Sequence, residues 1–245
     1  MSTIRMFIGT SANGEDKEIE MAYEYTLRKN CTSDLEITWM RQTPDLTSTW
    51  GGWETRTWST PFSGYRWAIP EACGFEGKAI YTDCDMLNFK DITELYNTNL
   101  NGKPFAARVG SRFGGHEFCV MVIDCAVAQQ YLIPVARMKR IPETHQRYIG
   151  QFSGNHDLVE PLHPKWNSLD GDKTPIDELW HLHYTNMATQ PWKPAWYTGK
   201  PEKHPRQELV QLYHDKVQEA YDAGCKPLEP DVDYLAFGTY NIIGK

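Results

Sequence analysis

The sequence predicts an α/β fold with a mainly parallel sheet, and two features of the chain indicate this class. The first 40 residues alternate an apolar run, an amphipathic stretch and a second apolar run, which is the pattern of a strand–helix–strand unit with parallel strands. A third apolar run, residues 79–81, leads directly into Asp83 and Asp85. Because open α/β sheets bind ligands beside the carboxyl ends of their strands, these two acids mark a candidate binding edge.

The apolar pattern gives the first elements in order. Residues 6–8 predict a strand that ends at Gly9, and residues 35–40 predict a second strand. Between them a helix is expected from the helical spacing of five residues, with Asn13 as its cap and Glu15 and Asp16 at its positive end. These five residues are Ile19, Ala22, Tyr23, Thr26 and Leu27.

Residues 43–62 predict a long loop, because they are rich in Thr, Ser, Gly and Trp. Its three tryptophans, Trp50, Trp53 and Trp58, either stack on a bound sugar ring or pack the loop onto the core. Packing is the commoner role of aromatic residues, so we expect packing.

The second half of the chain is less regular. A helix is predicted over residues 65–73 with Gly74 at its end, and strands over 104–109, 117–123 and 179–184. The glycine-rich segment 110–115 fits either a hairpin or a loop near a ligand, and residues 126–165 show no clear pattern. Residues 206–222 predict an amphipathic helix that stops at Gly224.

Composition limits the classes of partner. With 245 residues the chain is long enough for one large domain or two small ones. A net charge of −7 without a basic cluster argues against nucleic acid and anionic membranes, although an anionic substrate can still bind through a metal and one or two basic side chains. No apolar run reaches the length of a membrane span, the first nine residues do not form a secretory signal, and the six cysteines are scattered. We therefore expect a cytoplasmic protein with reduced thiols.

Asp-x-Asp occurs three times, and context distinguishes the three pairs. Asp170 and Asp172 flank a glycine and predict a polar turn, whereas Asp231 and Asp233 follow a proline near the end of the chain. Only the pair at 83 and 85 closes an apolar run in mid-chain. Side chains two residues apart in a strand face the same way, so these carboxylates are expected to converge on a hard divalent cation that holds a diphosphate.

The late strand offers a third metal ligand. His181 and His183 fall on one face of it, and Lys193 follows soon after. Two carboxylates and an imidazole suit Mn²⁺ or Mg²⁺ better than a closed zinc site, and a lysine would neutralise the diphosphate. The alternative is that both histidines simply hydrogen bond to backbone groups within the sheet.

Four segments together resemble glycosyltransferase family 8, which includes glycogenin and bacterial lipooligosaccharide galactosyltransferases. They are residues 7–11, residues 65–70 followed by 79–85, residues 120–124, and His183-Tyr184-Thr185 followed by Lys193-Pro194. The resemblance covers most of residues 1–40 and 62–125 and much of 145–196.

This resemblance implies a fold and an activity. The fold is GT-A, a single Rossmann-like domain over residues 1–245 with a mainly parallel twisted sheet flanked by helices. Residues 1–125 would form its nucleotide-binding half, 126–200 the half that completes the metal and acceptor sites, and 201–245 a C-terminal helix and tail. The activity is retaining transfer of a hexose from a UDP-sugar, UDP-glucose or UDP-galactose, to a glycan, lipid or protein acceptor, with Mn²⁺ or Mg²⁺.

The resemblance also implies roles for individual residues. It implies metal ligation by Asp83, Asp85 and His183, and contact with the diphosphate by Arg66 and Lys193. The nucleotide sugar would contact Gly9, Thr10, Ser11, Thr82, Asp83 and Cys84.

The chain departs from the family at several motif positions. The family's Asn-x-Gly falls on Glu117 and Cys119, and its Asp-Gln-Asp falls on His145-Gln146-Arg147, so that only Gln146 persists. Gln146 is therefore the candidate beneath the anomeric carbon, with Glu117 and Asp124 as alternatives. Trp196 takes the place of the tryptophan in the last signature.

Two other functions remain open. A sugar nucleotidyltransferase would carry a glycine-rich phosphate loop near the N-terminus. Residues 9–14 hold only two glycines, and the first basic residue after Gly9 is Lys17. A catalytically silent nucleotide- or glycan-binding protein fits the absence of acids at His145 and Arg147.

Overall fold

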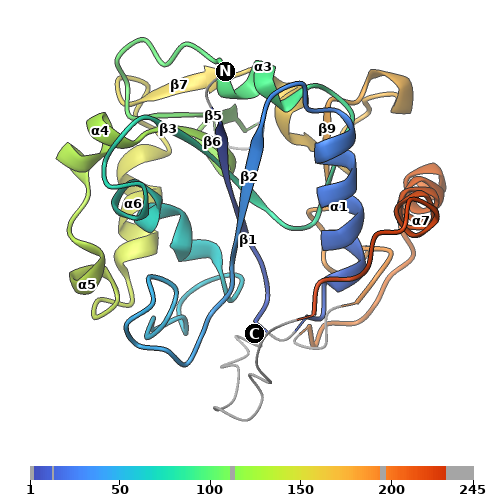
Figure 1. Ribbon diagram of the computed structural model, residues 1–245, viewed down its shortest axis with the longest axis horizontal. Coiled ribbons are helices and arrows are strands. Elements are labelled where there is room, and N and C mark those ends of the chain that lie inside the picture. Colours follow the sequence, from blue (N-terminus) through green and yellow to red (C-terminus); the bar gives the residue numbers. More distant parts are fainter. Residues whose placement is uncertain (1–2, 13, 111–113, 194–196, 230–245) are drawn as a thin grey trace.

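A six-stranded mixed sheet forms the centre of the molecule (Figure 1). The computed structural model describes residues 3–12, 14–110, 114–193 and 197–229. The strand order is β2-β1-β3-β6-β5-β7, where only β6 runs antiparallel to its neighbours. The mainly parallel sheet predicted from the sequence is therefore confirmed. The strands are β1 (Ile4–Gly9), β2 (Leu35–Met40), β3 (Lys78–Asp83), β5 (Phe105–Val109), β6 (His116–Asp124) and β7 (Val159–Leu162).

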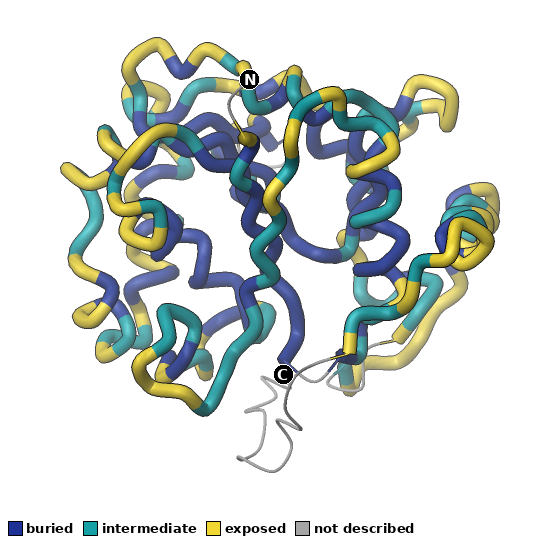
Figure 2. Tube along the Cα trace, viewed as in Figure 1, coloured by how far each residue is buried: buried dark blue, intermediate teal, exposed yellow. Residues whose placement is uncertain are grey.

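Helices cover both sides of this sheet. α1 (Lys17–Lys29) and α7 (Gln207–Asp222) lie on one side, and α4 (Cys125–Ala128), α5 (Val135–Met138) and α6 (Thr144–Phe152) lie on the other (Figure 1). The remaining α-helices of the described residues are α2 (Ile69–Ala72) and α3 (Ile92–Tyr96), and short 3₁₀ helices span Ser63–Ala68, Gln129–Tyr131, Pro164–Asn167 and Ile176–Glu178. Figure 2 shows the consequence, with most strands buried in the middle, the edge strand β2 largely at intermediate exposure, and most exposed segments at the periphery.

A second, small sheet joins distant parts of the chain. It consists of β4 (Met86–Asn88), β9 (His181–His183) and β8 (Ser168–Leu169), with β9 in the middle. Met86 pairs with His183 in antiparallel register. The segment that follows Asp85 is therefore held directly beside the late strand that carries the histidines.

The predicted helices form largely where the apolar spacing places them. In α1 all five residues at helical spacing are buried, although the proposed cap Asn13 lies outside the described residues. α7 ends before Gly224, which adopts the left-handed conformation with φ of +83°. The helix predicted over 65–73 differs, since it starts as a 3₁₀ turn and continues as α2. Pro70 lacks the backbone N–H that a continuous α-helix needs there.

The tryptophan loop packs onto the core, as predicted. Trp53 and Trp58 are buried, and the rings of Trp50, Trp53 and Trp58 lie 5.8, 5.6 and 5.3 Å from that of Tyr65. Gly64 makes this contact possible, because a Cβ there would lie 2.2 Å from the Trp58 ring.

The topology identifies one edge of the sheet as special. From β1 the chain crosses to β2 on one side, and β3 then adds on the other side of β1. The carboxyl ends of β1 and β3, where Gly9 is the register partner of Asp83, therefore form a topological switch point. Because β6 runs antiparallel, its first residues lie at the same edge.

One hydrophobic core extends from Ile4 to Trp166, and a second joins α1, α7 and the small sheet. The first core contains residues from both sides of position 125, so packing is continuous there. The division of the chain into two halves at this position stays a prediction about function. All six cysteines are free thiols, as predicted. Within the described residues, no helix combines the length and the apolar character needed to cross a bilayer.

Candidate functional site

A cavity of about 740 Å³ opens at the switch point. Its wall is formed by the tryptophan loop, the end of β3, the start of β6, the start of α6 and the segment after β9. Six of the predicted site residues line it, and five do not. The six are Arg66, Asp83, Cys84, Asp85, Gln146 and His183, whereas the five are Gly9, Thr10, Ser11, Thr82 and Lys193.

Arg66 is buried and fixes one wall of this cavity. It donates to the backbone oxygens of Ser63, at 2.6 Å, and Phe118, and its Nη2 lies 3.2 Å from Asp83 Oδ1. The guanidinium also stacks 4.3 Å above the Tyr81 ring, whose hydroxyl donates to the same Oδ1. Arg66 is therefore held in place as a buried positive charge, and Asp83 is oriented by two donors.

His183 faces Asp85 from the opposite strand. Its Nδ1 lies 3.0 Å from Asn167 Oδ1, which only accepts, so Nδ1 carries a proton and the neutral ring has its lone pair on Nε2. Nε2 lies 3.1 Å from Asp85 Oδ1, a buried oxygen with no hydrogen-bond partner among the described residues. A second proton on the ring or a metal cation between the two atoms would satisfy both lone pairs. Burial opposes the second proton, but the nearby carboxylates of Asp85 and Asp83 together raise the pKa of His183.

The neighbouring histidine has a different role. His181 Nδ1 lies 3.0 Å from the Trp166 carbonyl oxygen, and its Nε2 lies 2.7 Å from the Tyr23 hydroxyl. Burial lowers the pKa of His181 to about 3. The alternative of a hydrogen-bonded structural histidine is thus confirmed for His181, and His183 alone of the two points to the cavity.

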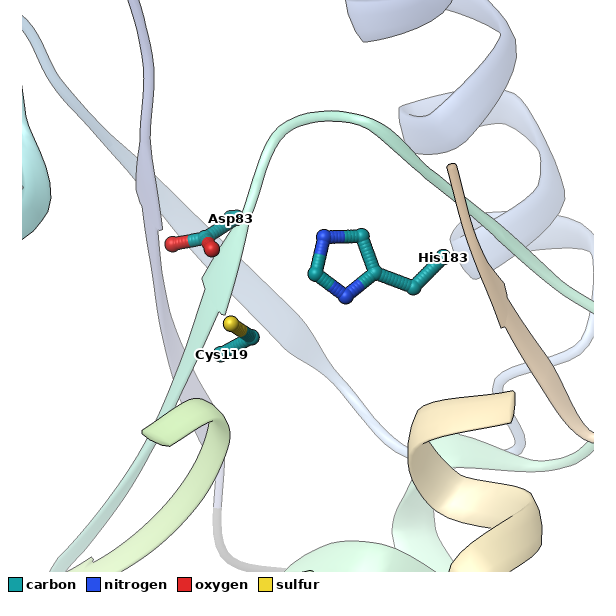
Figure 3. A group of neighbouring side chains, drawn as sticks. All are labelled: Asp83, Cys119 and His183. Carbon is teal, nitrogen blue, oxygen red and sulfur yellow. The ribbon is translucent and has the colours of Figure 1, made fainter. Parts of the chain in front are cut away.

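A thiol that was not predicted as a ligand completes a three-residue cluster. The candidate ligand atoms of Asp83, Cys119 and His183 all lie within 4.8 Å of one another (Figure 3), whereas Asp85 is not a member of this group. Burial, followed by the charge of Asp83, raises the pKa of Cys119. Cys119 could have been predicted as a ligand only from the antiparallel pairing of β3 with β6. The periodicity of apolar residues in the sequence does not reveal which strands pair.

The donor set and the charge of the cavity fit a divalent cation. Among the described residues, four carboxyl groups, those of Asp16, Asp83, Asp85 and Glu117, line it against one buried guanidinium, that of Arg66. Such a cavity repels a diphosphate unless a cation neutralises part of this charge. Asp85 Oδ1, which has no hydrogen-bond partner in the described part of the chain, lies beside an imidazole lone pair, and a metal ion satisfies such an arrangement.

The residues predicted to contact the nucleoside are engaged within the fold. The Thr10 hydroxyl donates to Glu20, and Ser11 Oγ donates to Asp16 Oδ2 at 2.8 Å. Thr82 Oγ1 lies 2.9 Å from the Tyr23 hydroxyl. At Gly9 a Cβ would lie 2.8 Å from the Phe62 ring, so glycine permits close packing there. Contacts of these residues with a nucleoside stay predictions.

Lys193 holds the turn after β9. Its ammonium donates to the carbonyl oxygens of Met187, Ala188 and Gln190 at 3.1, 2.9 and 2.7 Å. Those three bonds use all three hydrogens of the ammonium group. Contact of Lys193 with a diphosphate stays a prediction. Pro194 and Trp196 lie outside the described residues.

Gln146 lies on the wall formed by α6. Its Nε2 donates to the Thr57 carbonyl oxygen, which ties α6 to the tryptophan loop, while its Oε1 is 3.4 Å from the Thr57 hydroxyl. Of the two alternatives, Glu117 lines the cavity. Asp124 instead caps α4 at the other end of β6, accepting from Val127 N at 3.0 Å.

His145 lies beside Gln146 as a neutral imidazole. The Trp67 indole donates to His145 Nδ1 at 3.0 Å, so the ring hydrogen is on Nε2. Burial, with a smaller contribution from the charge of Arg66, lowers the pKa of His145 to about 3. The residue thus brings a neutral donor to a position where the family has an acid.

The second Asp-x-Asp pair is a turn, as predicted, and it has a structural role. Asp170 accepts from the backbone and the hydroxyl of Thr185 at 3.2 and 2.7 Å, and Asp172 forms an ion pair with Arg108 at 2.7 Å. A second cavity, of about 640 Å³, lies over this turn and shares Glu117 and Thr185 with the first.

Comparison with solved structures places the chain among glycosyltransferases by fold. Galactosyltransferase LgtC in complex with donor and acceptor sugar analogs matches 88% of this chain and 96% of its own, with a TM-score of 0.57 at 10% identity. The WbbM bifunctional glycosyltransferase matches 90% of this chain with a TM-score of 0.61 at 11% identity, and glycosyltransferase GlyE of Streptococcus pneumoniae TIGR4 matches 94% with a TM-score of 0.56 at 17% identity. The match covers 51% of the WbbM chain and 66% of the GlyE chain.

No family model matches the sequence, and no curated protein matches it. At these identities the structural likeness shows the fold alone. The chain has the GT-A fold predicted from the sequence, and its resemblance to glycosyltransferase family 8 is confirmed at that level.

Proposed function

We propose that the chain is a metal-dependent retaining glycosyltransferase that moves a hexose from a UDP-sugar, UDP-glucose or UDP-galactose, to a glycan, lipid or protein acceptor. One observation carries this proposal. A cavity at the switch point of a glycosyltransferase fold brings Asp83 and Asp85 together with His183, which lies about 100 residues further along the chain. Fold alone does not imply an activity, and it is the chemistry of these side chains that supports the proposal.

The proposed ion is Mn²⁺ or Mg²⁺, held by Asp83, Asp85 and His183. When bound, such an ion supplies electrostatic stabilisation to the diphosphate as the sugar leaves. The excess of carboxyl groups in the cavity supports this role, because the described part of the chain places a single guanidinium there, that of Arg66. Arg66 orients Asp83 by donating to it, and its fixed charge favours the negative leaving group.

The rest of the donor would lie against residues of the wall. In this proposal Thr10 and Ser11 contact the nucleoside, with Gly9, Thr82 and Cys84 close by, and Lys193 contacts the diphosphate. The three carbonyl bonds of Lys193 would then have to be exchanged in part for bonds to the ligand.

Retention requires that the new bond forms on the face from which the old one breaks. The bond from the anomeric carbon to the diphosphate oxygen breaks, the bond to the acceptor oxygen forms, and the acceptor proton passes to the departing phosphate. Gln146 is suited to lie beneath the sugar, because Thr57 anchors its amide nitrogen while its oxygen is only weakly held. That oxygen would stabilise positive charge at the anomeric carbon.

The first experiment is a panel of UDP-sugars with Mn²⁺, measured as release of UDP. We expect turnover with one donor and a loss of about 100-fold or more in Asp85→Asn, the size of effect seen when one group at a developing charge is removed. Asp215→Asn is the matched control, since Asp215 is exposed on α7. Turnover in Asp85→Asn equal to that of the wild type would refute the role of this carboxylate.

The second candidate is a catalytically silent binding protein, favoured by the replacement of family acids at His145 and Arg147. It predicts a thermal shift with UDP-sugar and Mn²⁺ but no free UDP. A sugar nucleotidyltransferase would instead consume a sugar phosphate and a nucleoside triphosphate and release pyrophosphate.

A further inference from the structure

We propose that Cys119 is an additional ligand of the metal, binding as a thiolate, and that it gives this site a preference for thiophilic divalent ions such as Zn²⁺, Co²⁺ and Cd²⁺ over Mg²⁺. The inference rests on the ion site of the proposed function, and it concerns the identity of the ion rather than that of the sugar.

The sheet register brings the thiol to the acid. In the antiparallel pair of β3 and β6, Tyr81 pairs with Met121 and Thr82 with Val120. The next step of this register sets Asp83 opposite Cys119, and directly opposite residues project from the same face of a sheet with Cβ atoms about 5 Å apart. Arg66 reinforces this arrangement, because it donates both to Asp83 and to the carbonyl oxygen of Phe118, the residue before Cys119.

The third member of the cluster comes from the small sheet. Figure 3 shows the His183 ring facing Asp83 and Cys119 across the gap between the two sheets. The ligand atoms of the three residues lie within 4.8 Å of one another, which is close enough for all three to reach one ion with small movements. The hydrogen bond from Nδ1 to Asn167 aims the lone pair of Nε2 outward.

The chemistry of this donor set differs from that of carboxylates and imidazole alone. Carboxylate oxygens suit Mg²⁺ and Mn²⁺, whereas a thiolate selects softer ions and imidazole suits transition metals such as Zn²⁺. A set with one oxygen, one nitrogen and one sulfur therefore favours Zn²⁺ or Co²⁺. Asp85 Oδ1 lies 3.1 Å from Nε2 and has no hydrogen-bond partner among the residues that the structure describes, so it offers a fourth protein donor to such an ion.

A second cysteine provides a matched control. Cys84 is buried, lines the same cavity and stands between the two acids in sequence, but it is not a member of the three-residue cluster. Replacement of either cysteine by serine is nearly isosteric. A difference between the two variants in metal binding would thus report the position of the sulfur and not the loss of a thiol in general.

The experiment is titration of the wild-type protein with Co²⁺, measured by absorption. We expect a thiolate-to-cobalt charge-transfer band in the near ultraviolet that saturates at one ion per chain. Cys119→Ser should lose the band and Cys84→Ser should keep it, with circular dichroism to verify the fold of both. Affinity for Cd²⁺ should fall by about tenfold or more in Cys119→Ser, since even outer partners of metal ligands have effects of that size.

Absence of the band in wild-type protein that binds Co²⁺ would overturn the inference without any need for a variant. Persistence of the band in Cys119→Ser would overturn it as well. The result is separable from the proposed function. UDP release without a charge-transfer band leaves the transferase and removes the thiolate, whereas a band without UDP release from any donor leaves the thiolate and removes the transferase.

Discussion

Two histidines two residues apart in β9 differ in chemistry because their partners differ. His181 is buried between a carbonyl oxygen and the Tyr23 hydroxyl, and it is neutral. His183 has an amide oxygen on one nitrogen and a carboxylate near the other, so it is poised to bind a proton or a metal. The partner of Nε2 makes the difference, since it is a hydroxyl for His181 and the Asp85 carboxylate for His183.

Asn167 positions the His183 ring through its side-chain oxygen, so its substitution is expected to weaken metal binding. Asn167→Ala removes the acceptor that fixes the His183 ring, and we expect about a 10- to 100-fold loss of Mn²⁺ affinity by calorimetry, the range for outer partners of metal ligands. Asn167→Asp retains an acceptor and should recover most of the affinity. Equal affinity in the alanine variant and the wild type would show that the ring needs no such support.

Substitution of Lys193 tests whether this residue contacts the diphosphate in addition to the carbonyl oxygens that it holds in the turn after β9. Lys193→Ala removes the charge proposed for the diphosphate, and we expect about a tenfold weaker affinity for UDP, in the range of a hydrogen bond to a charged group. Lys203→Ala, at an exposed lysine, is the control. Unchanged affinity for UDP in Lys193→Ala would leave Lys193 only its structural role in the turn after β9.

At the scale of single residues, much of the candidate site could be predicted. Asp83, Asp85 and His183 do line one cavity, because the ends of neighbouring strands meet at one edge and the motif order marks those ends. Cys119 could not be predicted as a ligand, because its position depends on which strand pairs with β3 and in which direction. The buried partners of Arg66 and Lys193 are likewise set by tertiary packing.

At the scale of elements, the helices and longer strands follow from periodicity, whereas the small sheet does not. β8 and β4 have two and three residues, too few to show a period. Their pairing arises because β9 lies between them, and this pairing carries His183 to the cavity. The loop over 43–62 was predicted from composition, but the way its tryptophans gather on Tyr65 was not.

The start of α1 gives a pH prediction. Asp16 is buried next to Ser11 and Trp192, and burial raises its pKa from the usual 3.8 of an aspartate to about 7. A carboxyl whose pKa is raised on folding stabilises the fold below its unfolded pKa, and that contribution is lost as the pH rises through about 7. Asp16→Asn should therefore gain stability relative to the wild type as the pH rises from 4 towards 8.

The gain in the free energy of unfolding of Asp16→Asn relative to the wild type has an upper limit of about 4 kcal/mol, at about 1.4 kcal/mol for each pKa unit. Urea unfolding of both proteins across this pH range measures it, and titrating groups common to both proteins cancel in the difference. A stability difference that does not change with pH would contradict a raised pKa at Asp16.

At the scale of the whole molecule, α7 is part of the same folded unit as the site. Leu209 and Tyr213 of α7 share a core with Leu182 and Tyr184 of the late-strand segment, and the Tyr184 hydroxyl donates to the Leu209 carbonyl oxygen at 2.8 Å. We expect Leu209→Ala to lower the free energy of unfolding by about 2–5 kcal/mol in one cooperative transition. Leu212→Ala, at a half-buried position, should cost less. Two separate transitions would show that α7 unfolds on its own.

The central claim is that one divalent ion joins the acids at the end of β3 to His183 and there binds the diphosphate of the donor. The most direct measurement is the anomalous difference map of crystals grown with Mn²⁺ and UDP. The account predicts one manganese peak within coordinating reach of Asp83, Asp85 and His183 and of both phosphates. A bound UDP without manganese at these residues, or a peak elsewhere in the chain, would contradict it.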